Sequence, residues 1–167
     1  DAYIASTFYA ADRYASYKTE WEDFYQEGGI VIADRYTTSN MVHQASKMDD
    51  IEERASFLDW LDQYEYGLYK LPRPREVYFL DVPVDVSQDL IRDRKNKFTN
   101  ESQKDIHESD KDYLVKTYEN SKFVADKYQW HIVKCIDQDR NMRSVDQIHE
   151  EIYTRVISAI ESKKKDL

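Results

Sequence analysis

The sequence predicts an α/β domain built around a parallel β-sheet that helices cover on both faces. Three short apolar runs rich in β-branched residues have the composition of strands buried on both sides: GIVIA at 29–33, EVYFLDVP at 76–83 and HIVKCI at 131–136. Longer segments with helical periodicity lie between them. Because strands that alternate with helices form βαβ units, we expect the strands to lie parallel in one sheet.

Apolar residues at helical spacing place the helices. The first helix is expected at 2–26, before Gly28 and Gly29, and its apolar positions are Ile4, Phe8, Ala11, Ala15 and Trp21. The second is expected at 46–66, with Met48, Ile51, Ala55, Leu58 and Leu61 turned inward. Further helices are expected at 86–94, at 111–128 and after Ser144, which with Gln147 has the spacing of a capping box.

Composition bounds the class of protein. A chain of 167 residues with 41% apolar content fits a single domain, 1–167. The formal net charge of −9 disfavours nucleic acid and anionic membranes as partners. Cys135 is the only cysteine, and no run has the composition of a signal peptide or a membrane span. These features indicate a protein of the reducing cytoplasm.

The start of the sequence is unusual. It has no initiator methionine, and its first residues already have a helical pattern with no obvious cap and no strand before it. We therefore expect the sequence to be the remainder of a longer chain.

A candidate anion site lies where the first predicted strand ends. Parallel sheets bind ligands beyond the carboxyl ends of their strands, and Asp34 and Arg35 follow GIVIA directly. The guanidinium of arginine donates two parallel hydrogen bonds to a phosphate. Further polar side chains follow in the next turn: Ser39, Asn40, His43 and Gln44. The alternative is a structural ion pair between Asp34 and Arg35.

A candidate base site lies in the first helix. Tyr9 and Arg13 are four residues apart and so share a helix face. A flat ring beside a forked donor suits a nucleobase, which needs stacking and hydrogen bonds to its exocyclic oxygens. An ordinary surface pair of tyrosine and arginine is the alternative.

A basic cluster comprises Arg92, Arg94, Lys95 and Lys97, and it leads into a polar stretch. On a mobile segment such a cluster closes over polyphosphate, so 92–110 is a candidate lid, with a solvated charged face as the alternative. His107 and Glu108 fit no standard metal spacing and receive no role, and no metal ligand is assigned.

The order of these motifs resembles thymidylate kinase over nearly the whole chain. The motifs are FYAADRY, a strand ending in DRYTTSNMVHQ, then PREVYFLDVP and an arginine-rich loop. The most specific part matches the family pattern Asp-Arg-Tyr-x-x-Ser-x-x-Ala-Tyr-Gln, with Val42 and His43 in place of Ala and Tyr. The resemblance implies a kinase that uses ATP and Mg²⁺ to convert dTMP to dTDP for dTTP synthesis. It also implies a three-layer α/β/α P-loop kinase fold and a cytoplasmic homodimer.

The resemblance implies a role for each matching residue. Tyr9 falls where the family stacks a phenylalanine on thymine. Arg13 and Asn40 fall where the family reads the edge of the base. Arg35 falls where the family holds the dTMP phosphate. Asp34, Ser39 and Gln44 belong to the same acceptor segment. His43 replaces the tyrosine under the sugar, which leaves selectivity for deoxyribose open. Arg92 and Arg94 fall at the start of the lid, where basic residues of the family reach the ATP phosphates. These two residues and Arg35 are the expected catalytic residues.

One family element has no counterpart in these 167 residues. The only glycines are Gly28, Gly29 and Gly67, so there is no G-x-x-x-x-G-K-[ST] loop to cradle the donor phosphates. We expect the N-terminal strand and the P-loop to be missing, and these residues alone to be inactive. Two alternatives stay open: a deoxynucleoside kinase, and a non-catalytic protein that keeps the same scaffold.

Overall fold

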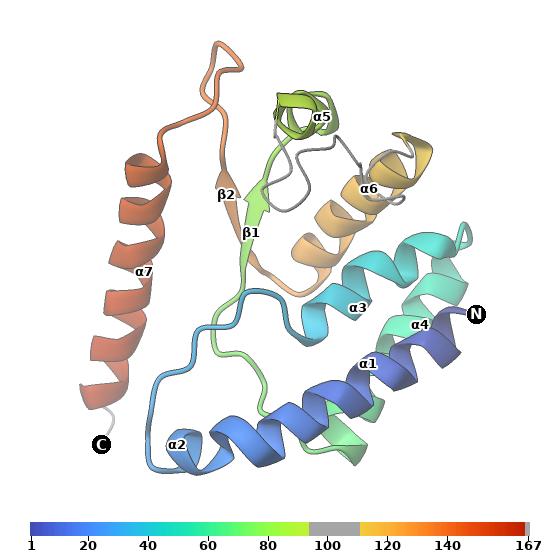
Figure 1. The fold of residues 1–167 in the computed structure, drawn as a ribbon, viewed down its shortest axis with the longest axis vertical. Coiled ribbons are helices and arrows are strands. Elements are labelled where there is room, and N and C mark those ends of the chain that lie inside the picture. Colours follow the sequence, from blue (N-terminus) through green and yellow to red (C-terminus); the bar gives the residue numbers. More distant parts are fainter. Residues whose placement is uncertain (94–110, 166–167) are drawn as a thin grey trace. The chain divides into compact units, whose positions relative to one another are not determined.

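The computed structural model describes residues 1–93 and 111–165, and these form two compact units (Figure 1). The helical unit consists of residues 1–73 together with 119–124. The sheet unit takes its described residues from 74–118 and 125–167. Within the described ranges no helix is long and apolar enough to cross a membrane. The expectations of one domain and of a cytoplasmic location stay predictions.

Residues 1–73 of the helical unit form four α-helices and short helical turns next to them. Two helices begin at an aspartate cap: Asp1 Oδ1 accepts from Tyr3 N at 2.7 Å, and Asp50 Oδ1 accepts from Glu53 N at 2.8 Å. The expectation that the first helix has no cap is therefore wrong. In chain order the elements are α1 (Ala2–Ser16), a π-helical turn (Tyr17–Trp21), α2 (Glu22–Gln26), α3 (Thr37–His43), a 3₁₀ turn (Ala45–Lys47), α4 (Ile51–Asp62) and a second π-helical turn (Gln63–Leu68).

The core of the helical unit lies between α1 and α4. Phe57 is fully buried, and its ring meets the ring of Tyr3 edge to face with centroids 4.9 Å apart. The inward positions expected for Met48, Leu58 and Leu61 are confirmed, whereas Ile51 is exposed. The second helix also starts later than expected, at residue 51 rather than 46, because the chain first makes the 3₁₀ turn.

The buried face of α1 is not the one with the bulky apolar residues. Ala2, Ser6 and Ala10 are buried, whereas Ile4 and Phe8 are 59% and 73% exposed. Small side chains let the backbone of α1 approach its neighbours closely, and Asn40 Nδ2 of α3 donates to Ser6 O at 3.3 Å. Ile4 and Phe8 therefore lie on the face of α1 that is turned away from the core of this unit.

The expected GIVIA strand is also not formed. Residues 29–33 form no helix and lie in no sheet of the described chain, and Ile32 is 85% exposed. A β-strand needs a neighbour whose backbone groups pair with its own, and no described segment supplies one. The run leads from α2 to α3 as an unpaired connection.

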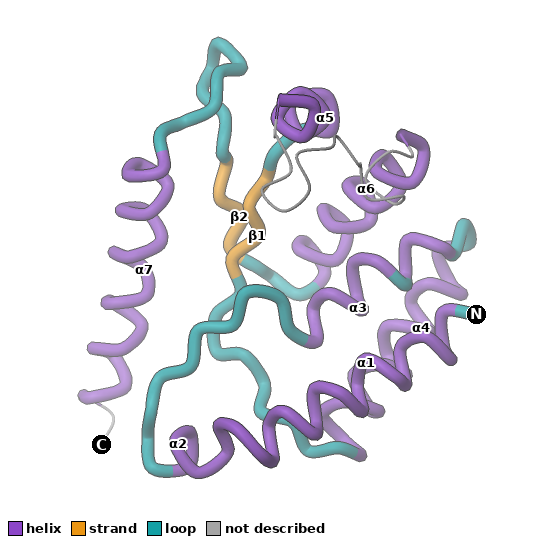
Figure 2. The backbone as a smooth tube through the Cα atoms, viewed as in Figure 1, coloured by secondary structure: helices purple, strands orange, loops and turns teal. Residues whose placement is uncertain are grey.

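The sheet unit confirms parallel pairing of the other two predicted strands. β1 (Tyr78–Asp81) lies beside β2 (His131–Lys134) and pairs with it (Figure 2). In this register Tyr78 is opposite His131 and Asp81 is opposite Lys134. The strands are less buried than expected, since Leu80 and Ile132 are exposed. The helices with residues in this unit are α5 (Val84–Asp93), α6 (Lys111–Lys127) and α7 (Val145–Lys165), and α6 gives residues 119–124 to the helical unit.

The start of α7 matches its sequence signal. Ser144 Oγ accepts from Gln147 N at 3.2 Å, and Ser144 N donates to Gln147 Oε1 at 3.0 Å. The predicted capping box is confirmed, because each side chain satisfies a backbone group of the other residue.

Replacing Phe57 with alanine should destabilise the chain by about 3–5 kcal/mol, because the substitution leaves a cavity where a fully buried ring packed. Urea denaturation followed by circular dichroism measures the loss. The matched control is Phe24→Ala, since Phe24 is 54% exposed. Equal losses for the two variants would contradict the position of Phe57 in the core.

Candidate functional site

The residues predicted to bind the substrate all lie in the helical unit. Tyr9 and Arg13 stand on α1, and Asp34 and Arg35 precede α3. Three more belong to α3, and one comes directly after it: Ser39, Asn40, His43 and Gln44. Each can therefore be described within one compact body.

A buried carboxylate joins two of the predicted residues. Glu65 lies in the second π-helical turn and is fully buried. Its Oε2 accepts from Arg13 Nε at 2.8 Å, and its Oε1 accepts from Arg13 Nη2 at 2.6 Å. Asn40 Nδ2 donates to the same Oε1 at 3.1 Å. The predicted base-reading residues of α1 and α3 are thus held on one acceptor.

The sequence analysis did not identify Glu65, although the sequence carries a signal for it. Phe57, Leu58, Leu61 and Glu65 follow one another at helical spacing, and all four are buried. A carboxylate at the next position of a buried helix face must have partners, because burying an unpaired charge is very costly. Such a position is a reason to look for a cation, and the cation here is Arg13.

Arg35 stands exposed in an unusual backbone conformation. Its φ of 70° lies in the left-handed region, which non-glycine residues seldom occupy. Its Nε donates to Ser39 Oγ at 3.0 Å, one turn along α3. The structure thus joins two of the residues that the sequence groups at the anion site, and Asp34 is exposed directly before them.

Tyr9 has the exposure that a stacking platform needs. Its side chain is 55% exposed on α1, one helical turn before Arg13. A ring that is open to solvent on a rigid helix can receive a flat ligand without repacking the core. This placement agrees with the predicted base site.

The far end of α3 is held by interactions within the helical unit. Asn120 is buried, and its Nδ2 donates to the carbonyl oxygens of Met41 at 3.0 Å and of Val42 at 2.7 Å. Gln44 is buried as well, and its Oε1 accepts from Lys47 Nζ at 2.7 Å. Gln44 therefore supports the end of the helix, whereas His43 keeps partial exposure.

Two tyrosines support the start of α3. The hydroxyl of Tyr36 donates to Pro72 O at 3.1 Å, and the hydroxyls of Tyr66 and Thr37 share a hydrogen bond. Burial raises the pKa of Tyr66 to about 12. Burial, followed by the nearby Tyr66 and the carboxylate of Glu65, raises the pKa of Tyr36 above its usual range. Both phenols stay neutral near pH 7 and act as supports rather than as acids.

The predicted lid is largely outside the described residues. Arg92 lies in the last turn of α5, where the backbone is described and the side chain is not. Arg94, His107 and Glu108 fall within 94–110, outside the described ranges. Their roles stay predictions.

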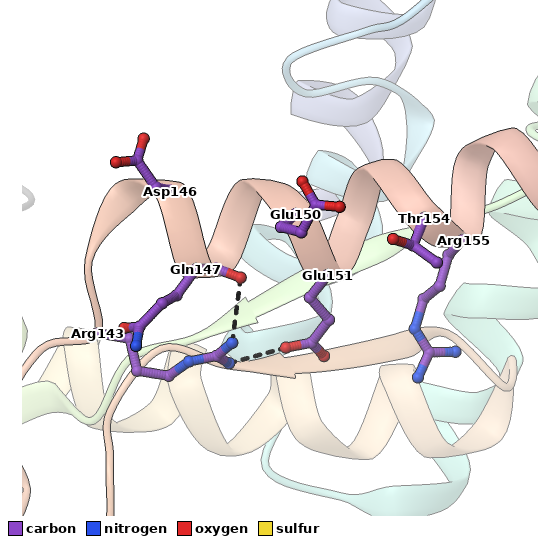
Figure 3. Close-up of a pocket in the computed structure, with 7 residues that line it drawn as sticks. All are labelled: Arg143, Asp146, Gln147, Glu150, Glu151, Thr154 and Arg155. Atoms are coloured by element: carbon purple, nitrogen blue, oxygen red, sulfur yellow. Dashed lines mark hydrogen bonds and ion pairs between the residues drawn. The ribbon is translucent and has the colours of Figure 1, made fainter.

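The sheet unit has a shallow pocket along α7 (Figure 3). It is lined by Arg143, Asp146, Gln147, Glu150, Glu151, Thr154 and Arg155. Arg143, which precedes α7, donates from Nη1 to Glu151 Oε2 of the helix at 2.8 Å. The pocket contains none of the residues predicted to bind a ligand, and we assign it no function.

The described residues form no cradle for the donor phosphates of ATP or for their Mg²⁺. The sequence has no glycine-rich P-loop, and in the described ranges no group of three or more histidine, cysteine, aspartate or glutamate side chains could hold a metal ion.

The two parallel strands, which alternate with helices along the chain, define an α/β protein. A family model described as thymidylate kinase matches residues 1–152. A protein of Staphylothermus marinus named "Probable thymidylate kinase" is 30% identical over 150 residues, which are 89% of this chain and 66% of the relative. The chain belongs to the thymidylate kinase family, and it spans about two thirds of that relative's length.

Proposed function

We propose that the chain binds dTMP as part of an enzyme that transfers the γ-phosphate of ATP to it, giving dTDP for dTTP synthesis. The observation that supports this most directly is the anchoring of Arg13 and Asn40 on one buried carboxylate, at the place where the base is expected. Family membership and the name of the Staphylothermus marinus relative favour the same acceptor.

Each acceptor-side residue has a role in this proposal. The ring of Tyr9 stacks on thymine, and Arg13 and Asn40 read its edge. Arg35 holds the phosphate through its forked donors, with Ser39 as the hydroxyl beside it. Asp34, His43 and Gln44 complete the segment, with His43 under the sugar. Arg92 and Arg94 are proposed to reach the ATP phosphates.

ATP with Mg²⁺ supplies the transferred phosphoryl group in this family. Because the sequence has no P-loop to cradle those phosphates, we propose that the chain supplies the acceptor site, with Arg92 and Arg94 as its lid contacts to ATP. Phosphoryl transfer depends on positioning and on neutralising the donor phosphates, so we also propose that these 167 residues by themselves are inactive. The three-layer P-loop fold of the complete enzyme is part of the same proposal.

Two other functions are separated by their ligands. A deoxynucleoside kinase would bind thymidine and would not need a residue for a phosphate already on the acceptor. A non-catalytic protein on the same scaffold would bind without turnover. The exposed Arg35 beside Ser39 favours an acceptor that already carries an anion.

We also propose a homodimer, from the exposed face of α1. Ile4 and Phe8 are exposed there, and Ala11 and Ala15 continue the stripe. A two-fold contact would bury this stripe against its own copy. Sedimentation of the wild-type chain beside Phe8→Glu tests it, and a monomeric wild type contradicts it.

The central prediction concerns Arg35. Replacing it with alanine should weaken dTMP binding by about 2–5 kcal/mol, because the phosphate loses its charged partner. Arg35→Lys should also bind weakly, since an ammonium cannot form two parallel bonds. Calorimetric titration of the chain with dTMP measures both variants. Arg75→Ala, on an exposed arginine of the sheet unit, is the control, and an Arg35→Ala variant that binds like wild type removes the phosphate role.

A second prediction concerns Tyr9. Tyr9→Ala should weaken dTMP binding by about 1–3 kcal/mol if the ring stacks on the base. Tyr9→Phe should be nearly silent, because it keeps the flat ring. Tyr153→Ala is the matched control, since Tyr153 is exposed to a similar degree. A phenylalanine variant as damaging as the alanine variant contradicts stacking.

A third prediction concerns catalysis. A protein made only of these 167 residues should give no measurable ADP from ATP and dTMP in a coupled assay, because no P-loop holds the donor. The comparison is the same assay on the chain together with any residues that precede Asp1 in its gene. Turnover by the 167 residues alone would mean that unidentified residues form the donor site.

A further inference from the structure

Glu65 holds two residues of the proposed base site, Arg13 and Asn40, but is not itself expected to touch the base. We propose that Glu65 is a positioning residue that sets which hydrogen-bonding groups Arg13 and Asn40 present to the base, and so sets the choice of base. This inference rests on the proposed function, since it concerns the selectivity of the base site for dTMP over dCMP. It adds a residue that touches no substrate.

The guanidinium of Arg13 is held by one of its edges. Its Nε and Nη2 donate to the two oxygens of Glu65, at 2.8 and 2.6 Å. Among the described residues, Nη1 has no hydrogen-bonding partner, so this nitrogen is available to a ligand. Arginine has only donors, and it therefore presents a donor to the base.

The amide of Asn40 is held in one of its two orientations. Its Nδ2 donates to Ser6 O at 3.3 Å and to Glu65 Oε1 at 3.1 Å, so protein oxygens accept from the amide nitrogen on two sides. A flipped amide would turn its carbonyl oxygen toward these two oxygens, which repel it. The group that remains for a ligand is thus the acceptor Oδ1.

A donor beside an acceptor matches the edge of thymine and opposes that of cytosine. Thymine offers a carbonyl oxygen at position 4 and an N–H at position 3, which pair with Nη1 of Arg13 and Oδ1 of Asn40. Cytosine offers an amino group and a bare ring nitrogen at the same places. A buried polar group that faces the wrong partner loses its hydrogen bond and is strongly disfavoured.

Glutamine at position 65 separates this role from simple packing. It has the shape of glutamate, but one of its two oxygens becomes an amino group, so it cannot accept from both edge nitrogens of Arg13. Either the guanidinium or the Asn40 amide must then turn. We expect Glu65→Gln to weaken dTMP binding about 10-fold or more. The ratio of the affinity for dTMP to the affinity for dCMP should also be lower in Glu65→Gln than in wild type.

The experiment is calorimetric titration of the chain with dTMP and with dCMP. Wild type should prefer dTMP by at least about 100-fold. Glu52→Gln makes the same chemical change at an exposed position of α4 and should keep the wild-type ratio. A Glu65→Gln variant that keeps the ratio, whether its affinities are unchanged or equally reduced, overturns the positioning role. That result concerns Glu65 only, and the proposal that the wild-type chain binds dTMP stands. A wild type that does not bind dTMP overturns both proposals.

If the Glu65→Gln variant does not fold, a measurement on the wild type tests the same proposal. In ¹⁵N spectra, the Nε–H of Arg13 should exchange slowly with solvent both without dTMP and at saturation, because Glu65 holds it in both states. Arg13→Lys identifies the signal by its loss. If dTMP releases this proton to fast exchange, Glu65 does not position Arg13 in the complex, and the proposal is wrong.

Discussion

The helical unit depends on a carboxylate that has no contact with water. Glu65 is buried in the π-helical turn that follows α4, and such a charge is tolerated only with a close cation and further hydrogen-bond donors. Arg13 supplies the cation from α1, and Asn40 supplies the extra donor from α3. Three elements distant in sequence are fixed to one another through this group. The geometry of the candidate base site is a result of that requirement.

Much of the candidate site could be predicted from the sequence, because its residues stand in short motifs with clear chemistry. The joint placement of Tyr9 and Arg13 follows from helical spacing, and the pair of Arg35 and Ser39 follows from their closeness in the chain. Glu65 was not predicted, since its partners are 52 and 25 residues away. Local patterns do not reveal contacts over such separations.

The fold was predictable where a segment finds its partner within the chain. β1 and β2 pair as parallel strands, as their alternation with helices indicates. GIVIA has the same composition and forms no strand in the described chain, because strand formation depends on a neighbour as much as on propensity. The direction in which the bulky stripe of α1 faces was not predictable either, since apolar side chains can lie on either of two helix faces. Periodicity alone does not say which of them meets the core.

The π-helical turn after α4 has a consequence for comparing this chain with its relatives. Such a turn closes its backbone ring over one extra residue, as when Tyr69 N donates to Tyr64 O at 3.1 Å. Removing one residue here would rotate the next segment of the chain by roughly 100° about the helix axis. Buried Leu71, and the Pro72 carbonyl that accepts from Tyr36, would then leave their places. An alignment that places a one-residue gap between Gln63 and Leu68 therefore marks a relative in which the loop leading to β1 is built differently.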